Sequence, residues 1–456
     1  MVQLPVTPSP FSMGSLRTLA RGRMPGQLII QYTDRCNATC PQCEMRKQNE
    51  FERTSLDVDT GRRLIDAAAA KGVEALSFTG GEPFMAKDDV LQLIRHAGEV
   101  GIKYIRTGTN GFMFMGVDTP KWESRVRGLV EALAATRLYT FWVSIDSVDP
   151  AVHEEMRGLP GVLRGIEKAL PIFHEHGIYP SANLGINRNA GGDYRKLLPD
   201  KPASEFNPRE FYDYFRSAFG RFYQRVADLG FSIVNMCYPM SVEPAADGKR
   251  LAVYSATSPD RIVRFRKEEK VQLFQALFDT VPQFRSKVRI FTPLTSVLSI
   301  LRNYRGEEGH HSYGCRGGVD FFFVNSASGD AFPCGYRGTD NMGKYWDLDV
   351  KSIDKNASCT QCDWECFRDP SEMIGPFTEL TARPFTVLGR LLRDPEWRRL
   401  WTQDLRYYRA CDYFCGRKPM RPERLARFRT QTQPEGPQPE APQPAGGPKP
   451  QLAGAA

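Results

Sequence analysis

The sequence predicts an α/β protein: a partial (β/α)6 barrel of the TIM type, followed by a small cysteine-rich α+β domain. Over residues 27–238, short β-branched or apolar runs alternate with amphipathic helical stretches, which is the pattern of a parallel sheet. Polar motifs follow these runs directly, at the strand ends where such sheets carry their working face. Beyond the barrel, seven of the 11 cysteines lie between Cys315 and Cys415.

The elements of the barrel follow one another in a regular order. The predicted strands are residues 28–32, 75–78, 104–107, 139–145, 179–186 and 232–236. The predicted helices are residues 60–71, 88–100, 122–135, 162–176 and 208–229. The first helix shows the expected spacing, because Leu64, Ile65 and Ala68 share one face.

The remaining segments complete the predicted domain organisation. Residues 1–26 are expected to form a flexible arm, and residues 239–310 to bridge two domains. Within that bridge, residues 268–279 predict a helix, whereas 288–291 and 296–301 are ambiguous. The cysteine-rich domain spans residues 311–430. Residues 431–456 are rich in Pro, Gln and Gly and are expected to be disordered, because they cannot bury enough apolar surface.

Composition limits the classes of function. A net charge of +8 over 456 residues is mild and suits an anionic cofactor, substrate or redox partner as well as nucleic acid. The sequence contains no run of 18 apolar residues, so it predicts no membrane-spanning helix. Residues 1–26 carry arginines but no apolar core of a signal peptide, so an organelle transit segment is the alternative to a mobile arm. Cysteines at metal-ligand spacings favour a reducing cytoplasm and metal rather than disulfides.

The motif with the clearest chemistry is Cys36-x3-Cys40-x2-Cys43, directly after the first predicted strand. Three thiolates this close can hold three corners of an iron–sulfur cube or of a zinc tetrahedron, but they leave the fourth position open. An open position is where a metal performs chemistry. The structural alternative is a zinc loop completed by a distant residue.

Further motifs stand at the ends of the next strands: Gly80-Gly81-Glu82-Pro83, Thr109-Asn110-Gly111, Ser144-Ile145-Asp146 and His153-x3-Arg157. With the three cysteines, they resemble the radical S-adenosylmethionine (SAM) enzymes over residues 27–240. The resemblance implies a four-iron four-sulfur cluster whose fourth iron chelates the amino and carboxylate groups of SAM. An electron from the reduced cluster would split the sulfonium, and the resulting 5′-deoxyadenosyl radical would abstract hydrogen from a substrate. All-thiolate ligation favours the low potential this requires.

The same resemblance implies roles for individual side chains. Glu82 would pair with the ammonium of SAM, and Arg157 with its carboxylate. The implied SAM-binding residues are Gly80, Gly81, Glu82, Asn110, Ser144 and Arg157. Glycines let backbone approach a ligand closely, although a plain turn is their ordinary reading. An ordinary surface arginine is the alternative for Arg157. Gln42 stands where this family usually has an aromatic residue.

The C-terminal cysteines form a second group: Cys315, Cys334, Cys359, Cys362, Cys366, Cys411 and Cys415. The spacing Gly329-x4-Cys334 and the hairpin expected at residues 321–325 and 332–334 resemble the SPASM and twitch extensions of radical SAM enzymes. The resemblance implies auxiliary four-iron four-sulfur clusters. Seven thiolates could hold two clusters, or four could hold one while the others are structural. A zinc site is the alternative, because CxxC pairs bind zinc equally well.

Cys237 belongs to neither group and ends the sixth predicted strand. A thiol there could return a hydrogen atom to a substrate radical, as in radical epimerases; a buried, inert cysteine is the commoner case. Tyr238 and Asp320 are further candidates for a polar substrate contact or proton acceptor. His310 and His311 are expected to lie in a loop rather than to bind metal.

The partners follow from the resemblance. A flavodoxin or ferredoxin would supply the electron, and the substrate would be a peptide or a small molecule. Residues 390–409 mix tryptophans, tyrosines and arginines, which could suggest RNA contact, but helical spacing favours aromatic packing with solvated arginines. The rival interpretation is a non-catalytic iron–sulfur or zinc protein that acts as an electron carrier or scaffold.

Overall fold

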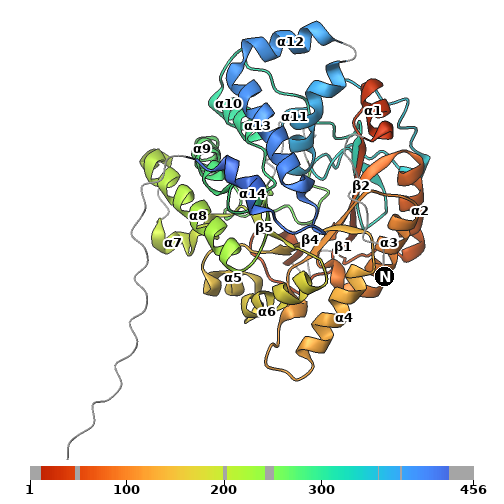
Figure 1. Ribbon diagram of the computed structural model, residues 1–456, viewed down its shortest axis with the longest axis vertical. Helices are drawn as coiled ribbons and strands as arrows, with labels where there is room; N and C mark the ends of the chain where they lie inside the picture. The colour runs from red at the N-terminus through yellow and green to blue at the C-terminus, as the bar shows by residue number, and fades with distance from the viewer. Residues whose placement is uncertain are drawn as a thin grey trace, which may run out of the picture.

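The computed structural model describes residues 12–46, 52–198, 203–241, 251–357, 359–380 and 383–430. These residues confirm the predicted α/β class, with a parallel sheet wrapped by helices and a cysteine-rich C-terminal region (Figure 1). The predicted tail at 431–456 lies outside the described residues.

The sheet runs in the order β7-β6-β5-β4-β3-β2-β1-β8-β9. Its strands are β1 (Gly26–Thr33), β2 (Val73–Gly80), β3 (Tyr104–Thr109), β4 (Leu138–Ser144), β5 (Ser181–Gly185), β6 (Ile233–Cys237), β7 (Arg289–Ile290), β8 (Phe321–Val324) and β9 (Ala331–Phe332). All pairs are parallel except β8 with β9, which form the predicted hairpin. Because β8 also pairs with β1, the C-terminal region continues the sheet of the barrel.

The helices surround the sheet and form a separate group above one end of it in Figure 1. They are α1 (Met13–Ala20), α2 (Val58–Ala70), α3 (Lys87–Glu99), α4 (Trp122–Ala134), α5 (Pro150–Arg157), α6 (Val162–Glu175), α7 (Tyr194–Leu197), α8 (Pro208–Asp228), α9 (Lys267–Phe284), α10 (Leu294–Arg305), α11 (Glu365–Leu380), α12 (Pro384–Arg393), α13 (Pro395–Ala410) and α14 (Pro422–Leu425). Among the described helices, none combines the length and apolar character needed to cross a bilayer.

Local sequence fixes where several helices begin. The Asp57 side chain accepts a hydrogen bond from Thr60 N at 2.7 Å at the start of α2. Asp149 caps α5 in the same way, accepting a hydrogen bond from Ala151 N at 2.9 Å. Pro150 follows at the first helical position, where a backbone N–H would have no partner within the helix. Because α5 lies between β4 and β5, this cap helps to position Arg157 at its end.

Side chains alternate along the strands between two environments. Outward residues such as Ile105, Phe141 and Leu184 are fully buried against the helices and form the main core. The opposite side, which we call the inner face, is half-buried and largely polar. On β3 to β6 its members include Arg106, Trp142, Ser144, Asn183, Asn235 and Cys237.

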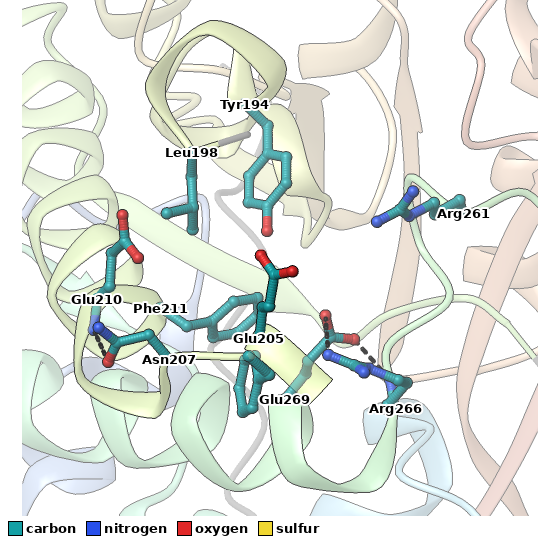
Figure 2. A pocket seen from close by; sticks show the side chains of 10 residues that line it. Tyr194, Leu198, Glu205, Asn207, Glu210, Phe211, Arg261, Arg266 and Glu269 are labelled. Atoms are coloured by element: carbon teal, nitrogen blue, oxygen red, sulfur yellow. Dashed lines mark hydrogen bonds and ion pairs between the residues drawn. The ribbon is translucent and has the colours of Figure 1, made fainter. Parts of the chain in front are cut away.

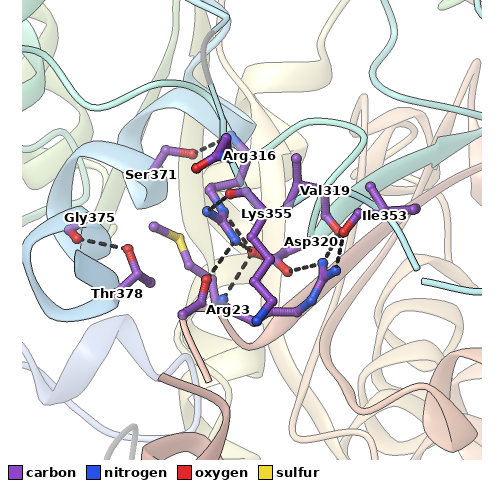
Figure 3. A network of polar contacts seen from close by, with 12 residues as sticks. Arg23, Arg316, Val319, Asp320, Ile353, Lys355, Ser371, Gly375 and Thr378 are labelled. Carbon is purple, nitrogen blue, oxygen red and sulfur yellow. Dashed lines mark hydrogen bonds and ion pairs between the residues drawn. The ribbon is translucent and has the colours of Figure 1, made fainter. Parts of the chain in front are cut away.

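A network of ion pairs joins the N-terminal segment to the C-terminal region (Figure 3). Asp320 receives Arg23 Nη1 at 3.2 Å, Arg316 Nε at 2.6 Å and Met24 N at 3.0 Å. Residues 12–26, which fall within the predicted arm, therefore contain α1 and are tied to residue 320. The carboxylate of Asp320 has two arginine partners, so its place is in this network rather than as a proton acceptor for a substrate.

A second polar feature lies among the outer helices. Figure 2 shows a pocket between α7, α8 and the segment that precedes α9, lined by Tyr194, Phe211 and Arg266 among others. Glu269, which lines the pocket, pairs with Arg188 at 2.8 Å. None of the site residues predicted from the sequence lines this pocket.

Candidate functional site

The three motif cysteines lie in the loop that follows β1, at the carboxyl end of the sheet. All three are half-buried. The loop turns tightly, with Cys43 N donating to Cys40 O at 3.1 Å and Ala38 N to Cys36 Sγ at 3.5 Å. Burial raises the pKa of each thiol, to about 12 for Cys40, and the charges of Cys36 and Cys40 raise the pKa of Cys43 further. The three thiols are therefore close enough to influence one another within one short loop.

A buried arginine stands beside this loop. Arg157 ends α5, where its backbone oxygen accepts from Thr39 N at 3.0 Å. Its positive charge opposes burial and lowers the pKa of the Cys36 and Cys40 thiols. The guanidinium also pairs with Asp146 Oδ2 at 2.7 Å. Burial remains the larger effect, so the three groups are thiols here; beside a fixed cation they fit the chemistry of an anionic iron–sulfur cluster, which would bind them as thiolates.

Gln42, the departure from the aromatic pattern, has a contact of its own. Its Nε2 donates to Asp146 Oδ2 at 2.8 Å, while its Oε1 is buried without a partner. Asp146 therefore ties the cysteine loop to the end of β4 and to Arg157. In the sequence, Asp146 stands within a motif, but nothing in that motif indicated a role for it.

The glycines of the second motif serve the same loop. Gly80 has a φ of +144°, and a Cβ on it would lie 1.9 Å from Thr33 O. A Cβ on Gly81 would lie 2.1 Å from Arg35 O. The two backbones meet through hydrogen bonds from Gly81 N to Thr33 O at 2.7 Å and from Glu82 N to Arg35 O at 2.8 Å. Glycine is thus required at both positions because the backbone packs directly against the start of the cysteine loop. The sequence suggested another reason, the close approach of a ligand to the backbone.

Glu82 is fully buried and bridges two strand ends. One carboxylate oxygen accepts from Phe84 N at 3.0 Å and the other from Asn110 N at 2.6 Å. Burial raises the pKa of Glu82 to about 7, although these hydrogen bonds and the Arg157 charge act in the opposite direction. Backbone groups of this chain therefore already engage both oxygens, and contact with an ammonium remains a prediction.

Asn110 and Ser144 complete the set expected to bind SAM. Asn110 Nδ2 donates to Asn37 Oδ1 at 2.8 Å and lies 3.9 Å from Cys36 Sγ, so it contacts the cysteine loop directly. Ser144 ends β4 on the inner face, opposite Asn183 of β5. The structure therefore gathers all six residues and the three cysteines at one edge of the sheet.

Four of the C-terminal cysteines form a second group. Cys315 N donates to Cys359 O at 2.8 Å, which pairs their two segments. Burial raises the pKa of the Cys315, Cys334 and Cys362 thiols to about 12, and the charge of Cys359 raises each of them further. These four cysteines match the ligand number of a fully thiolate-bound cluster.

Cys366 lies with a different set of residues. Its Sγ donates to Glu365 Oε1 at 3.4 Å. Cys237, on the inner face, donates to Asn183 Oδ1 at 3.3 Å, and burial together with the charges of Glu365 and Cys366 raises its pKa well above the ordinary value. Cys237 and Cys366 therefore both lie beside Glu365, a residue that no motif in the sequence indicated.

Cys411 and Cys415 are not brought to either group. The loop that follows them is joined to the beginnings of β4 and β5, with Gly416 N donating to Tyr139 O at 2.9 Å and Tyr179 N to Gly416 O at 2.7 Å. These are the amino ends of parallel strands, whereas Cys36 follows a carboxyl end. The two cysteines therefore lie at the opposite end of the sheet from the first motif.

The other candidates have structural partners. Tyr238 is buried, and its backbone N donates to Glu365 Oε2 at 3.1 Å. His310 lies in the loop after α10, as expected, and its Nε2 is 2.8 Å from Asn303 Oδ1. In the stretch 390–409, Trp397 donates to Glu372 and stacks on Trp401 at 5.7 Å, so these aromatic residues pack as the helical spacing predicted.

Aromatic residues fill the space between the two cysteine groups. Tyr254 contacts Trp364 at a centroid distance of 6.5 Å and Phe323 at 5.3 Å, within one apolar cluster that also touches Cys36, Cys43, Cys315 and Cys362. The Tyr254 hydroxyl is 2.8 Å from Thr79 Oγ1, beside the glycine motif. Tyr254 lies in a segment without a recognisable pattern, so no sequence signal pointed to it.

The described residues contain no group of three or more His, Cys, Asp or Glu side chains positioned around a single metal ion. The fit to a cluster therefore depends on the donor set itself: three thiols in one short loop, and four thiols in a second group.

Comparison with known proteins gives matches over this part of the chain and beyond. Residues 30–187 match the Radical SAM superfamily. An AdoMet-dependent heme synthase from Methanosarcina barkeri is 25% identical over 372 residues, which cover 78% of this chain and 88% of that protein. A GTP 3′,8-cyclase from Mannheimia succiniciproducens is 31% identical over 181 residues, 38% of this chain and 50% of the relative.

Among solved structures, SuiB of Streptococcus suis bound to S-adenosylmethionine aligns at 16% identity with a TM-score of 0.45. That alignment covers 72% of this chain and 65% of SuiB, so more than a third of SuiB has no counterpart in it. Residues 30–187, which contain the three-cysteine site, match the radical SAM superfamily, and the chain is a radical SAM enzyme.

Proposed function

We propose that this enzyme binds a four-iron four-sulfur cluster through Cys36, Cys40 and Cys43, cleaves SAM reductively, and abstracts hydrogen from a peptide or small-molecule substrate. When bound, the cluster would supply the electron that splits SAM, delivered by a flavodoxin or ferredoxin. The observation that carries this proposal is the set of three half-buried thiols beside the Arg157 cation, at the edge of the inner face.

The chain's own residues have distinct tasks in this proposal. Asp146 holds Arg157 and Gln42, and so fixes the cation relative to the cysteine loop. Gly81 and Glu82 fix the loop from the other side through backbone hydrogen bonds. Ser144, half-buried on the inner face, is the hydroxyl that would hydrogen-bond SAM.

We further propose that Cys315, Cys334, Cys359 and Cys362 hold one auxiliary four-iron four-sulfur cluster. The influence of Cys359 on the pKa of the other three thiols and the Cys315–Cys359 backbone hydrogen bond support this set. Cys366 would then face the substrate with Cys237, and Cys411 and Cys415 would be structural. The relatives act on dissimilar molecules according to their names, so they favour no single substrate.

The test is production of 5′-deoxyadenosine. Protein reconstituted anaerobically with iron and sulfide, reduced with dithionite and given SAM should form 5′-deoxyadenosine. Cys40→Ala is the matched blank. Iron and sulfide bound without any 5′-deoxyadenosine above that blank would favour the rival interpretation, an electron carrier or scaffold.

A further inference from the structure

One arginine on the inner face lacks the partner that comparable arginines have. Arg157 pairs with Asp146 at 2.7 Å, Arg188 with Glu269 at 2.8 Å, and Arg285 with Asp404 at 2.6 Å. Arg106, in the middle of β3, has no hydrogen bond and no ion pair with any described residue, and its Nε is buried without a partner.

An unpaired guanidinium in this position is costly. Arginine stays protonated in proteins, and a buried charge without a counter-ion destabilises the fold. The ionisable groups near enough to influence Arg106 are Cys366 and Tyr139. Thiols and phenols are neutral at pH 7 at their ordinary pKa values, so neither supplies the missing negative charge.

The surroundings of Arg106 are those of a binding surface. Ser77 of β2 and Thr140 of β4 flank it in the sheet, and both point to the inner face. One inner position further along β3 is Gly108, where a Cβ would lie 2.1 Å from the Trp142 ring. The indole therefore lies against Gly108, where only glycine leaves room for it.

We propose that Arg106 binds an oxyanion of the substrate, a carboxylate or a phosphate, within the inner face. The planar guanidinium matches either group through two parallel hydrogen bonds, and the Ser77 hydroxyl adds a donor, whereas the Thr140 hydroxyl donates to Phe414 O at 3.3 Å. A substrate anchored there would extend along the Trp142 ring toward the carboxyl ends of the strands, where Ser144 and Cys237 lie. This inference rests on the proposed function, because it assigns the substrate of the same enzyme.

The experiment measures thermal unfolding of the anaerobically reconstituted protein without SAM or reductant, so its outcome does not depend on SAM cleavage. Benzoate and inorganic phosphate are added separately, each against chloride at equal ionic strength. Wild type is compared with Arg106→Met and Arg106→Lys. Arg285→Met is the matched control, since it removes a buried arginine that has a carboxylate partner.

We expect one or both oxyanions to raise the Tm of the wild type by about 1–3 °C at ten times Kd, and to leave Arg106→Met unchanged. Benzoate alone would identify a carboxylate and phosphate alone a phosphate ester. Without oxyanion, Arg106→Met should keep or raise Tm, whereas Arg285→Met should lower it. Arg106→Lys should retain a smaller response, because it keeps the charge without the fork.

Three results would overturn the inference. The first is the absence of any oxyanion effect on the wild type. The second is an equal rise in wild type and Arg106→Met. The third is a loss of Tm or of folding in Arg106→Met as large as that in Arg285→Met, which would make Arg106 structural. None of these results would bear on 5′-deoxyadenosine formation, so the proposed function is tested separately.

Discussion

Arg157 Nη2 and Asp146 Oδ2 are 2.7 Å apart, and both side chains are almost fully buried. The pair connects the end of α5 with the end of β4 beside the cysteine loop. A buried ion pair loses most when one partner is removed, because the other charge remains without compensation.

Asp146→Asn should therefore lower the free energy of unfolding by about 3–5 kcal/mol. Urea unfolding of the protein without cofactors measures this change in the free energy of unfolding. Asp118→Asn is the control: Asp118 pairs with Arg164 at 2.8 Å on the surface, and its loss should cost about 0–1 kcal/mol. Equal effects of the two substitutions would contradict the role assigned to Asp146.

Gly81→Ala should disrupt the cysteine loop. A Cβ 2.1 Å from Arg35 O forces two backbones apart, and overpacking of this kind costs about 1–3 kcal/mol or more. We expect a lower Tm and a loss of iron bound by the first cluster site. Gly128→Ala is the control, because a Cβ there meets nothing within 4 Å on α4 and should be neutral or stabilising. Full iron content in Gly81→Ala would show that the loop tolerates the shift.

His153 should make stability depend on pH. Its Nδ1 accepts from Asp146 N at 3.0 Å, and burial, with the Arg157 charge, lowers its pKa well below the ordinary value. Below about pH 6.5 the unfolded chain binds a proton at His153 and the folded chain does not. His153 therefore has no effect on the free energy of unfolding well above pH 6.5. Below that pH, its protonation in the unfolded chain lowers the free energy of unfolding by up to about 1.4 kcal/mol per pH unit.

The measurement is urea unfolding of wild type and His153→Gln between pH 5 and 8. Glu82 acts in the opposite sense, because its pKa is raised to about 7 and the folded state takes up its proton first. The difference between wild type and variant removes that contribution, since both proteins keep Glu82. A difference that stays constant across this range would exclude titration of His153.

Iron content should separate the two roles proposed for the C-terminal cysteines. In a background that lacks Cys36, Cys40 and Cys43, Cys362→Ala should remove the remaining iron and sulfide, about four of each per chain. Cys411→Ala should leave them unchanged, because Cys411 lies near the opposite end of the sheet. Loss of iron in both variants, or zinc without sulfide in either protein, would contradict the four-cysteine assignment.

Much of this architecture could be predicted from the sequence. The β–α alternation located all six predicted strands, because the side chains of each strand that point outward to the helices are apolar and buried. The position of each motif directly after a strand then located the site. The region between residues 239 and 310 was harder. β7 has two residues, too few to show a period, and α10 buries the polar residues Thr295, Ser296 and Ser299 together with its apolar ones, so the sequence does not show which faces are buried.

Individual contacts could not be predicted, because they join residues far apart in the chain. Nothing near Gln42 indicates that it reaches Asp146. Nothing near Asp320 indicates that Arg23 and Arg316 would bind it. The spacing of Cys411 and Cys415 suggested ligands, but the loop beyond them pairs with strand beginnings on the far side of the sheet. Arg106 was missed because a single arginine within a strand has no pattern.

The central claim is that the loop at Cys36–Cys43 leaves one iron of its cluster open for SAM. Electron paramagnetic resonance of the dithionite-reduced protein tests it most directly, in a variant whose Cys315, Cys334, Cys359 and Cys362 are alanine so that one cluster remains. Addition of SAM should change the g-values of the signal, and Cys40→Ala should abolish the signal. A spectrum that SAM leaves unaltered, from a cluster that needs Cys40, would show the fourth iron already capped and would contradict the account.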